Sequence, residues 1–233
     1  MHRRNVLLAV AVLDGPGEPG GAGLDVGDNP YHLRLLAGHK HAVRALAAHG
    51  RTLVSGSYDM TVRVWDTLTG KLTQDLRGHR QKVYSVVLDH RRERCASGSM
   101  DGTVRLWSIR DGTCLHELDG HSSLVGLLGI SRRQLVYAAA DSTLRVWDAA
   151  LGSCQHVLVA HSGAITCFQH DDDKVVSGSD GMLKLWNVRD GTFVRDLLVG
   201  LTGVWQVRFD GRYCVAAVQR NGQSEFAGAS ASL

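Results

Sequence analysis

Residues 38–66 read GHKHAVRALAAHGRTLVSGSYDMTVRVWD, and this stretch decides the fold. It opens on Gly38-His39 and closes on Trp65-Asp66. Between these pairs, Leu53–Ser57 and Val62–Trp65 have the short length and the β-branched content of strands, and turn residues flank them. The stretch therefore predicts a small antiparallel β unit.

The same marks return three more times along the chain. Four histidines stand 40, 42 and 40 residues apart, and each is followed by an aspartate and then, six residues later, by a tryptophan. The residues are His39, His79, His121 and His161; Asp59, Asp101, Asp141 and Asp180; and Trp65, Trp107, Trp147 and Trp186. A unit of about 40 residues with four short strands and Gly-His and Trp-Asp marks is the WD40 repeat. We predict an all-β WD40 β-propeller with four full four-stranded blades and partial blades at both ends.

The repeated polar residues predict a structural network in each blade. A buried imidazole and a buried indole N–H both need hydrogen-bond partners. In this fold the histidine bonds the aspartate, and a strand serine links the histidine to the tryptophan. The candidate serines are Ser55, Ser97 and Ser177. The third unit has the run 138–140, Ala-Ala-Ala, which offers no hydroxyl, so we expect its network to be incomplete.

A catalytic interpretation of these histidines is weaker than the structural one. His39 and Asp59 could suggest a His–Asp pair, but the pair recurs in every unit and no nucleophile accompanies it. The histidines belong to different blades, so they do not cluster as metal ligands do. The sequence also has no nucleophile elbow, phosphate loop or paired carboxylates. We expect a protein that is not an enzyme and that holds no metal and no cofactor.

Composition bounds the class of protein and its partners. The chain has 233 residues, is 44% hydrophobic and 21% charged, and carries a net charge of only +3, which gives no argument for a nucleic-acid or membrane partner. Residues 6–13 weakly imitate the apolar part of a signal peptide, but no small-residue cleavage site follows, so a leftover propeller strand is favoured. The five cysteines are widely spaced and odd in number. We expect reduced, mostly buried thiols in a nuclear or cytoplasmic protein.

The two ends of the chain look incomplete. We predict an irregular Gly-rich segment at 1–28, the propeller region at 29–223 and a disordered Ala/Ser-rich tail at 224–233. Residues 31–37 have the pattern of the outer strand of a preceding blade, and residues 204–218 that of a degenerate fifth unit. We expect an open arc with exposed apolar faces that self-associates. The alternative is a five-bladed ring closed by residues 31–37, which would need a further strand from Asn221 onward, where strand formers are few.

Several stretches resemble one family more closely than a generic propeller. They are 29–36 (NPYHLRLL), 83–90 (VYSVVLDH), 121–128 (HSSLVGLL), 197–205 (LLVGLTGVW) and 215–218 (VAAV). Over roughly residues 29–223 the chain resembles the C-terminal half of fungal F-box/WD-repeat cell-division-control proteins. The resemblance implies an eight-bladed propeller that binds phosphorylated degron peptides as substrate receptor of an SCF-type ubiquitin ligase. An F-box would dock on the Skp adaptor, but no F-box and no early-blade arginines are visible in this chain, which therefore looks like a fragment.

The resemblance also implies a peptide site. Arg44 matches the last arginine of the family's phosphate clamp, Tyr58 and Tyr84 match aromatic residues of the peptide groove, and Trp205 matches a groove tryptophan. An arginine presents a fork of donors that suits phosphate, and tyrosine suits an extended peptide. In later blades the position of Arg44 and Tyr84 is held by Gly126 and Thr166, Ala140 stands where Tyr58 does, and Gln206 stands where some relatives have arginine.

Interpretations of these residues without a binding role remain open. In the structural alternative, Arg44 is only a solvated charge at the end of a strand and Tyr58 only an aromatic residue at the rim. The run 91–94, Arg-Arg-Glu-Arg, is interpreted as solvated surface on the opposite face. The main hypothesis is a receptor for phosphorylated protein substrates. The alternatives are a generic WD-repeat scaffold of another intracellular complex and a non-functional truncated gene product.

Overall fold

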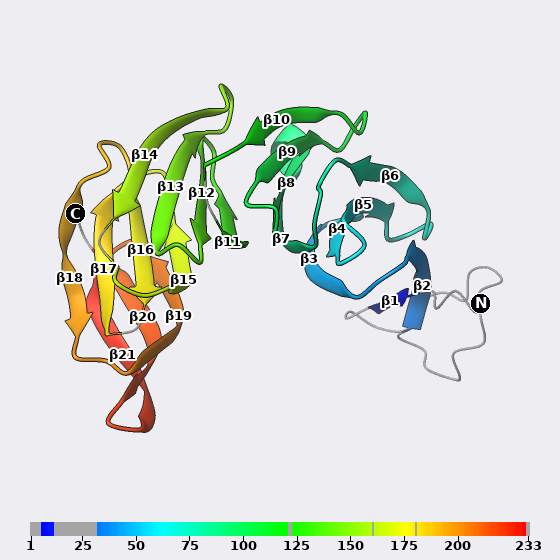
Figure 1. The fold of residues 1–233 in the computed structure, drawn as a ribbon. Coiled ribbons are helices and arrows are strands. Elements are labelled where there is room, and N and C mark those ends of the chain that lie inside the picture. Colours follow the sequence, from blue (N-terminus) through cyan, green and yellow to red (C-terminus); the bar gives the residue numbers. More distant parts are fainter. Residues whose placement is uncertain (1–5, 12–31, 121–122, 160, 180, 232–233) are drawn as a thin grey trace. The chain divides into compact units, whose positions relative to one another are not determined.

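The computed structural model describes residues 6–11, 32–120, 123–159, 161–179 and 181–231, which consist almost entirely of antiparallel strands (Figure 1). Four sheets contain four strands each, and each sheet is one sequence repeat. Their strands in chain order are β3 (Val43–His49), β4 (Thr52–Ser57), β5 (Thr61–Asp66) and β6 (Leu72–Arg77) in blade one; β7 (Val83–Asp89), β8 (Arg94–Ser99), β9 (Val104–Ser108) and β10 (Cys114–Leu118) in blade two; β11 (Val125–Ile130), β12 (Gln134–Ala139), β13 (Thr143–Asp148) and β14 (Ser153–Val159) in blade three; and β15 (Ile165–His170), β16 (Lys174–Ser179), β17 (Met182–Asn187) and β18 (Phe193–Val199) in blade four. The predicted all-β WD40 propeller architecture with four full blades is confirmed.

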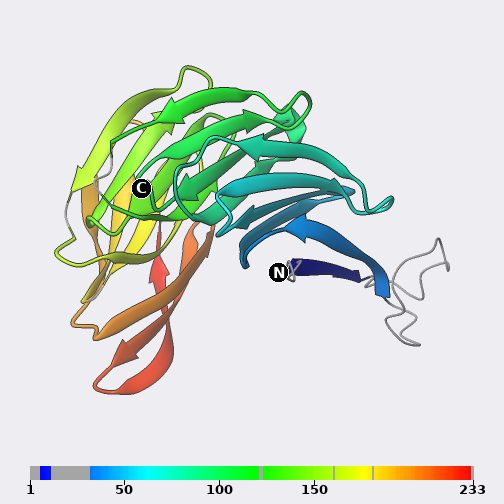
Figure 2. The same cartoon turned by 45° about the vertical axis from the view of Figure 1, so that its right-hand side comes forward.

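Two smaller sheets stand at the ends of this series. Blade five has the three strands β19 (Gly203–Asp210), β20 (Tyr213–Arg220) and β21 (Gln223–Ser230). Strand β1 (Val6–Ala11) pairs antiparallel with β2 (His32–His39), and Figure 2 shows the two side by side. A short 3₁₀ helix, His90–Arg92, joins β7 to β8.

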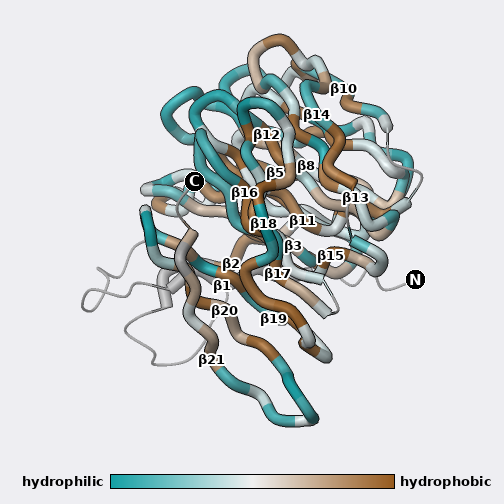
Figure 3. The backbone as a smooth tube through the Cα atoms, turned by 90° about the vertical axis from the view of Figure 1, so that its left-hand side faces the viewer, coloured by the Kyte–Doolittle hydropathy of each residue, from teal (hydrophilic) through white to brown (hydrophobic). Residues whose placement is uncertain are grey.

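The chain divides into two compact units. The first comprises residues 1–101 and 105–116 and holds blades one and two, and the second comprises 102–104 and 117–233 and holds blades three to five. Within each unit the core lies between neighbouring blades. Val54 and Val62 of blade one pack with Val83 and Val86 of blade two. The second strand of blades two, three and four is buried along its whole length because both of its faces are covered. Figure 3 shows the tip of the β20–β21 hairpin in teal, which marks hydrophilic residues.

The prediction of a disordered tail at 224–233 is wrong. Strand β21 pairs with β20 from Gln223 to Ser230, and the Ala231 amide donates to the carbonyl of Arg212. The small residues that discouraged a strand prediction serve packing, since Ala227 lies against the apolar cluster shared with blade four. Tertiary pairing here overrides a weak strand propensity.

The prediction of an irregular segment at 1–28 is also wrong where that segment is described. Residues 6–11 form β1, as the leftover-strand interpretation predicted, and the remainder of 1–28 lies outside the described residues. Strand β2 agrees with the predicted outer strand at 31–37, of which Tyr31 is outside the described part. All five cysteines are free thiols, with Cys95, Cys167 and Cys214 buried and Cys114 and Cys154 exposed.

Candidate functional site

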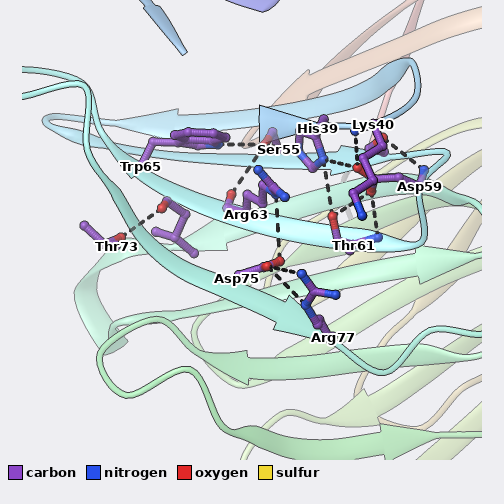
Figure 4. Close-up of polar contacts among 12 residues, drawn as sticks. His39, Lys40, Ser55, Asp59, Thr61, Arg63, Trp65, Thr73, Asp75 and Arg77 are labelled. Atoms are coloured by element: carbon purple, nitrogen blue, oxygen red, sulfur yellow. Dashed lines mark hydrogen bonds and ion pairs between the residues drawn. The ribbon is translucent and has the colours of Figure 1, made fainter. Parts of the chain in front are cut away.

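A chain of hydrogen bonds runs through blade one and orients its loops (Figure 4). Nε1 of Trp65 lies 2.8 Å from Oγ of Ser55, which lies 2.8 Å from Nε2 of His39, and Nδ1 of His39 lies 2.9 Å from Oδ2 of Asp59. A carboxylate only accepts, so His39 donates from Nδ1. Its Nε2 then accepts from the Ser55 hydroxyl, whose oxygen accepts from the indole N–H. These are the contacts that the repeat predicts.

The Asp59 carboxylate closes this network at the loop. It also accepts from the Lys40 amide at 2.8 Å and from the Thr61 hydroxyl at 2.6 Å. Burial raises the pKa of Asp59, but the hydrogen bonds from His39, Thr61 and Lys40 outweigh burial and hold this pKa well below its ordinary value. Asp59 therefore acts as a charged anchor for the loop that follows His39.

Blades two and four repeat the arrangement. Trp107 and Trp186 each donate to a serine at 2.8 Å, and the same serine oxygens lie 2.8 Å from Nε2 of the blade's histidine. These serines are Ser97 with His79, and Ser177 with His161. Nδ1 of His79 lies 3.1 Å from Asp101. His121 and Asp180, which complete the predicted set, lie outside the described residues.

Blade three departs from the repeat at one residue before the alanines to which the sequence analysis assigned the departure. The position of the serine is held by Tyr137, which pairs with Arg145 as Ser55 pairs with Arg63, and not by the alanines that follow it. Tyr137 is fully buried and its ring stacks on Trp147 with centroids 6.0 Å apart. A hydroxyl is therefore present in this blade, although it is a phenol and its pKa is raised by burial. Asp141 still accepts from the amide and hydroxyl of Thr143.

Three of the four proposed peptide-contacting residues, Arg44, Tyr84 and Trp205, share a backbone feature that the sequence does not reveal. In the first strand of every blade the pairing register shifts by one residue, which marks a β-bulge. The residues at these bulges are Arg44, Tyr84, Gly126, Thr166 and Trp205. A bulge leaves one residue out of the ladder and redirects its side chain. Five equivalent positions are thus presented in the same way, and side chains of different chemistry occupy them.

Arg44, Tyr58 and Tyr84 come together in the first unit. The Tyr58 and Tyr84 rings lie 5.1 Å apart between centroids at an angle of 35°. The pKa of Tyr84 is raised chiefly by its hydrogen bond with Tyr58, and the nearby charge of Arg44 opposes this shift. Arg44 itself is exposed and makes no hydrogen bond or ion pair with the described residues. A free guanidinium beside two aromatic rings can bind an anion attached to an apolar peptide.

Sequence reasoning missed Lys82, which joins this cluster. Its Nζ lies 4.9 Å from the centroid of the Tyr58 ring, within the range of a cation–π contact. The available signal was its position two residues before Tyr84, in the loop that leads into β7. We call Arg44, Tyr58, Lys82 and Tyr84 the basic–aromatic cluster.

Trp205 belongs to the second unit and has the exposure expected of a contact residue. It is 61% exposed, an unusual state for tryptophan, and Gln206 beside it is also exposed. At the equivalent bulge of blade four, Thr166 donates instead to the carbonyl of Val204, 2.5 Å away. The bulge position is therefore structural in blade four and exposed in blade five.

The basic run 91–94 lies at the other end of β7 from Tyr84, about 20 Å along the strand. Arg91 is exposed, as expected, but the interpretation of the whole run as solvated is wrong for Arg94. Arg94 is only 7% exposed because it lies in β8, where its Nε donates to Asp89 at 3.0 Å. Arg92 pairs with the same carboxylate at 3.4 Å.

Neither a metal site nor a membrane-spanning helix was found in the part of the chain that the structure describes. No group of three or more His, Cys, Asp or Glu side chains there is placed to hold a metal ion. No helix within the described ranges is long and apolar enough to cross a membrane.

The repeats place the chain in a known family. Residues 31–66, 70–108, 112–148 and 152–187 match the family described as WD domain, G-beta repeat. The chain belongs to this WD-repeat family, and its repeats point to a binding or scaffold protein.

Three fungal proteins are similar to the chain. The chain is 53% identical to Cell division control protein 4 of Candida albicans over 83% of this chain and 28% of that protein. It is 54% identical to WD repeat-containing protein pop2 of Schizosaccharomyces pombe over 84% of this chain and 28% of the relative. Identity to Cell division control protein 4 of Saccharomyces cerevisiae is 39%, with coverage of 84% and 28%. The chain thus spans little more than a quarter of the length of these relatives.

Two solved structures of computationally designed proteins resemble the chain. The designed Ika4 protein is 38% identical with a TM-score of 0.61, covering 65% of this chain and 94% of its own. The designed Ika8 protein is 28% identical with a TM-score of 0.58, covering 84% of this chain and 74% of its own.

Proposed function

We propose that this chain is the peptide-binding part of a substrate receptor that recognises phosphorylated Ser/Thr segments of other proteins. The observation that carries the proposal is the free guanidinium of Arg44 at a β-bulge near the tilted ring pair of Tyr58 and Tyr84. Other arginines of the strands have a carboxylate partner, as Arg63 and Arg94 do. An exposed arginine held next to aromatic surface and left without a carboxylate is suited to an anion that arrives with a ligand.

Each member of the cluster has a distinct role in this proposal. Arg44 holds the phosphate with two of its N–H groups, because a planar fork matches two phosphate oxygens. The rings of Tyr58 and Tyr84 pack the apolar residues on either side of the phosphorylated one. Lys82 adds a second positive charge over the Tyr58 ring, which favours acidic residues near the phosphate. Trp205, in the second unit, offers an exposed aromatic surface of its own.

Similarity to the cell-division-control proteins supports a proposal for the cellular role. We propose that the receptor acts in an SCF-type ubiquitin ligase, in the nucleus or cytoplasm, and delivers phosphorylated substrates for ubiquitin-dependent degradation. The Skp adaptor would be reached through an F-box. A scaffold role in another complex is the competing proposal, and the position of Arg44 is the reason to prefer phosphopeptide binding.

Calorimetric titration of the full 233-residue chain tests the proposal. The probes are a peptide of about ten residues with one phosphothreonine between apolar neighbours, the same peptide without phosphate, and inorganic phosphate. We expect the phosphopeptide to bind much more tightly than the plain peptide, and its binding to weaken at raised salt, because the phosphate charge adds to the aromatic contacts that both peptides make. Equal binding of both peptides, or no binding of either, would reject the proposal in favour of a generic scaffold.

A further inference from the structure

Two core positions are buried in every four-stranded blade. One lies in the second strand and the other in the third, and both have 0% exposure in all four blades. They are Val54, Ala96, Val136 and Val176 in the second strands, and Val62, Val104, Leu144 and Leu183 in the third. Within each unit these side chains pack against the first strand of the next blade, as Val54 and Val62 pack against Val86.

Blade five has apolar residues at both positions but leaves them exposed. Counted from the bulge through the strand register, Val215 is equivalent to Val54 and Phe226 to Val62. Val215 is 51% exposed and Phe226 is 84% exposed. Tyr213, on the same face of β20, is 72% exposed. This face, defined by Tyr213, Val215 and Phe226, has the composition of a blade interface without a covering blade.

Blade one exposes the other surface of such a blade interface, the one that a preceding blade would cover. Val86 in blade two and Val207 in blade five each lie two residues after the bulge. They are 7% and 1% exposed, because the preceding blade covers them. Leu46 holds this position in blade one and is 52% exposed. Strand β2 covers only the neighbouring part of that face, where Leu36 packs on Leu53 and Trp65.

The free edge of the blade-five sheet also fits the surface of blade one with its strand β2. Among the described residues its sheet ends at β21, whereas blades one to four each have a fourth strand. Strand β2 has the pattern of a fourth strand, since Leu36 stands three residues before His39 as Leu76 does before His79, and both leucines are 1% exposed. An unpaired edge without lysine or proline favours strand addition.

We propose that two copies of this chain associate head to tail, with blade five of one copy packed on blade one of the other. Leu46 of the second copy covers Val215 and Phe226 of the first, in the way that Val86 covers Val54 and Val62. Strand β2 of the second copy lies along β21 with Leu36 opposite Phe226, the register in which Leu76 lies opposite Val62. To do so β2 exchanges its partner β1, which now places Leu8 opposite Leu36. Such a contact joins different surfaces of the two copies, so it can extend to further copies or close into a ring.

Sedimentation velocity of the full chain over a range of concentrations tests the proposal. We expect the weight-average mass to rise with concentration. Phe226→Lys and Leu46→Lys should each weaken association by at least about 100-fold, because either change buries an unpaired charge. Leu151→Lys is the control, since Leu151 is 73% exposed in a turn away from both surfaces and should leave association unchanged.

Mixing the two variants gives the decisive result. Phe226→Lys protein keeps the blade-one surface and Leu46→Lys protein keeps the blade-five surface, so an equimolar mixture should form a one-to-one heterodimer that does not grow further. Wild-type chain that stays monomeric at every concentration would overturn the proposal in favour of closure within one molecule. Association that neither variant weakens, or a mixture that does not form heterodimers, would overturn it as well.

Discussion

Replacing Asp59 with alanine tests whether the His–Asp pair is structural. The change removes the acceptor of the His39 Nδ1–H at 2.9 Å, of the Lys40 amide at 2.8 Å and of the Thr61 hydroxyl at 2.6 Å. Lys40 is exposed and Thr61 partly so, and both can turn to water, but His39 is only 2% exposed. The lasting cost is one buried unsatisfied donor, about 1–3 kcal/mol in the free energy of unfolding. For a chain of this size the melting temperature should fall by roughly 2–12 °C.

Differential scanning calorimetry of three variants separates this cost from the loss of an exposed turn contact. Asp59→Asn keeps an acceptor for His39 and should lose less than Asp59→Ala. Asp111→Ala is the matched control, because Asp111 is exposed in a turn of blade two and accepts only local bonds, from Ser108 and Thr113, among the contacts described. If Asp59→Ala melted at the wild-type temperature, or no lower than Asp111→Ala, the structural reading of the network would be refuted.

Three further predictions concern the fold and the site. Trp65→Ala should lower the free energy of unfolding by about 3–5 kcal/mol in urea titrations, because it truncates a 2%-exposed indole and removes its hydrogen bond to Ser55. A loss below about 1 kcal/mol would contradict a stabilising role for that ring. Burial, aided by the charge of Lys184, lowers the pKa of His161 from 6.5 to about 4, so the unfolded chain binds a proton between these pH values that the folded chain does not. Stability should therefore fall by up to about 3 kcal/mol from pH 6.5 to pH 4, and His161→Gln should flatten that part of the pH profile in urea unfolding; an unchanged slope would contradict the assignment. Tyr84→Ala should weaken phosphorylated and plain peptides alike, by about 3- to 10-fold in fluorescence anisotropy, since it removes apolar packing and no charge; a loss confined to the phosphorylated peptide would give Tyr84 a different role.

Regular spacing made most of the fold predictable. His39, Asp59 and Trp65 recur at nearly constant separations, and a repeat that fixes the two ends of each sheet also fixes the strands between them. The hydrogen bonds of Ser55 and Ser97 followed from the need of buried indole and imidazole groups for partners.

Features that depend on strand register were not predictable in the same way. A bulge adds one residue without any mark in the sequence, so the common presentation of Arg44, Tyr84 and Trp205 emerged only from the pairing. Register also showed that Tyr137 replaces the network serine. Strand β21 forms from residues of weak strand propensity because β20 offers it a complete edge, and Arg94 is buried because β8 begins within the basic run.

The central claim is that Arg44 binds the phosphate of a peptide ligand, and one calorimetric comparison tests it most directly. Arg44→Ala and Arg91→Ala are each titrated with the phosphorylated and the plain peptide; both side chains are exposed arginines, at opposite ends of the blades. Loss of a charge-assisted bond costs about 1.5–3 kcal/mol, which is a roughly 10- to 150-fold weaker dissociation constant. Our account predicts this loss for Arg44→Ala with the phosphopeptide only, while Arg91→Ala binds as wild type. An Arg44→Ala chain that binds the phosphopeptide as tightly as wild type, or that loses both peptides equally, would contradict it.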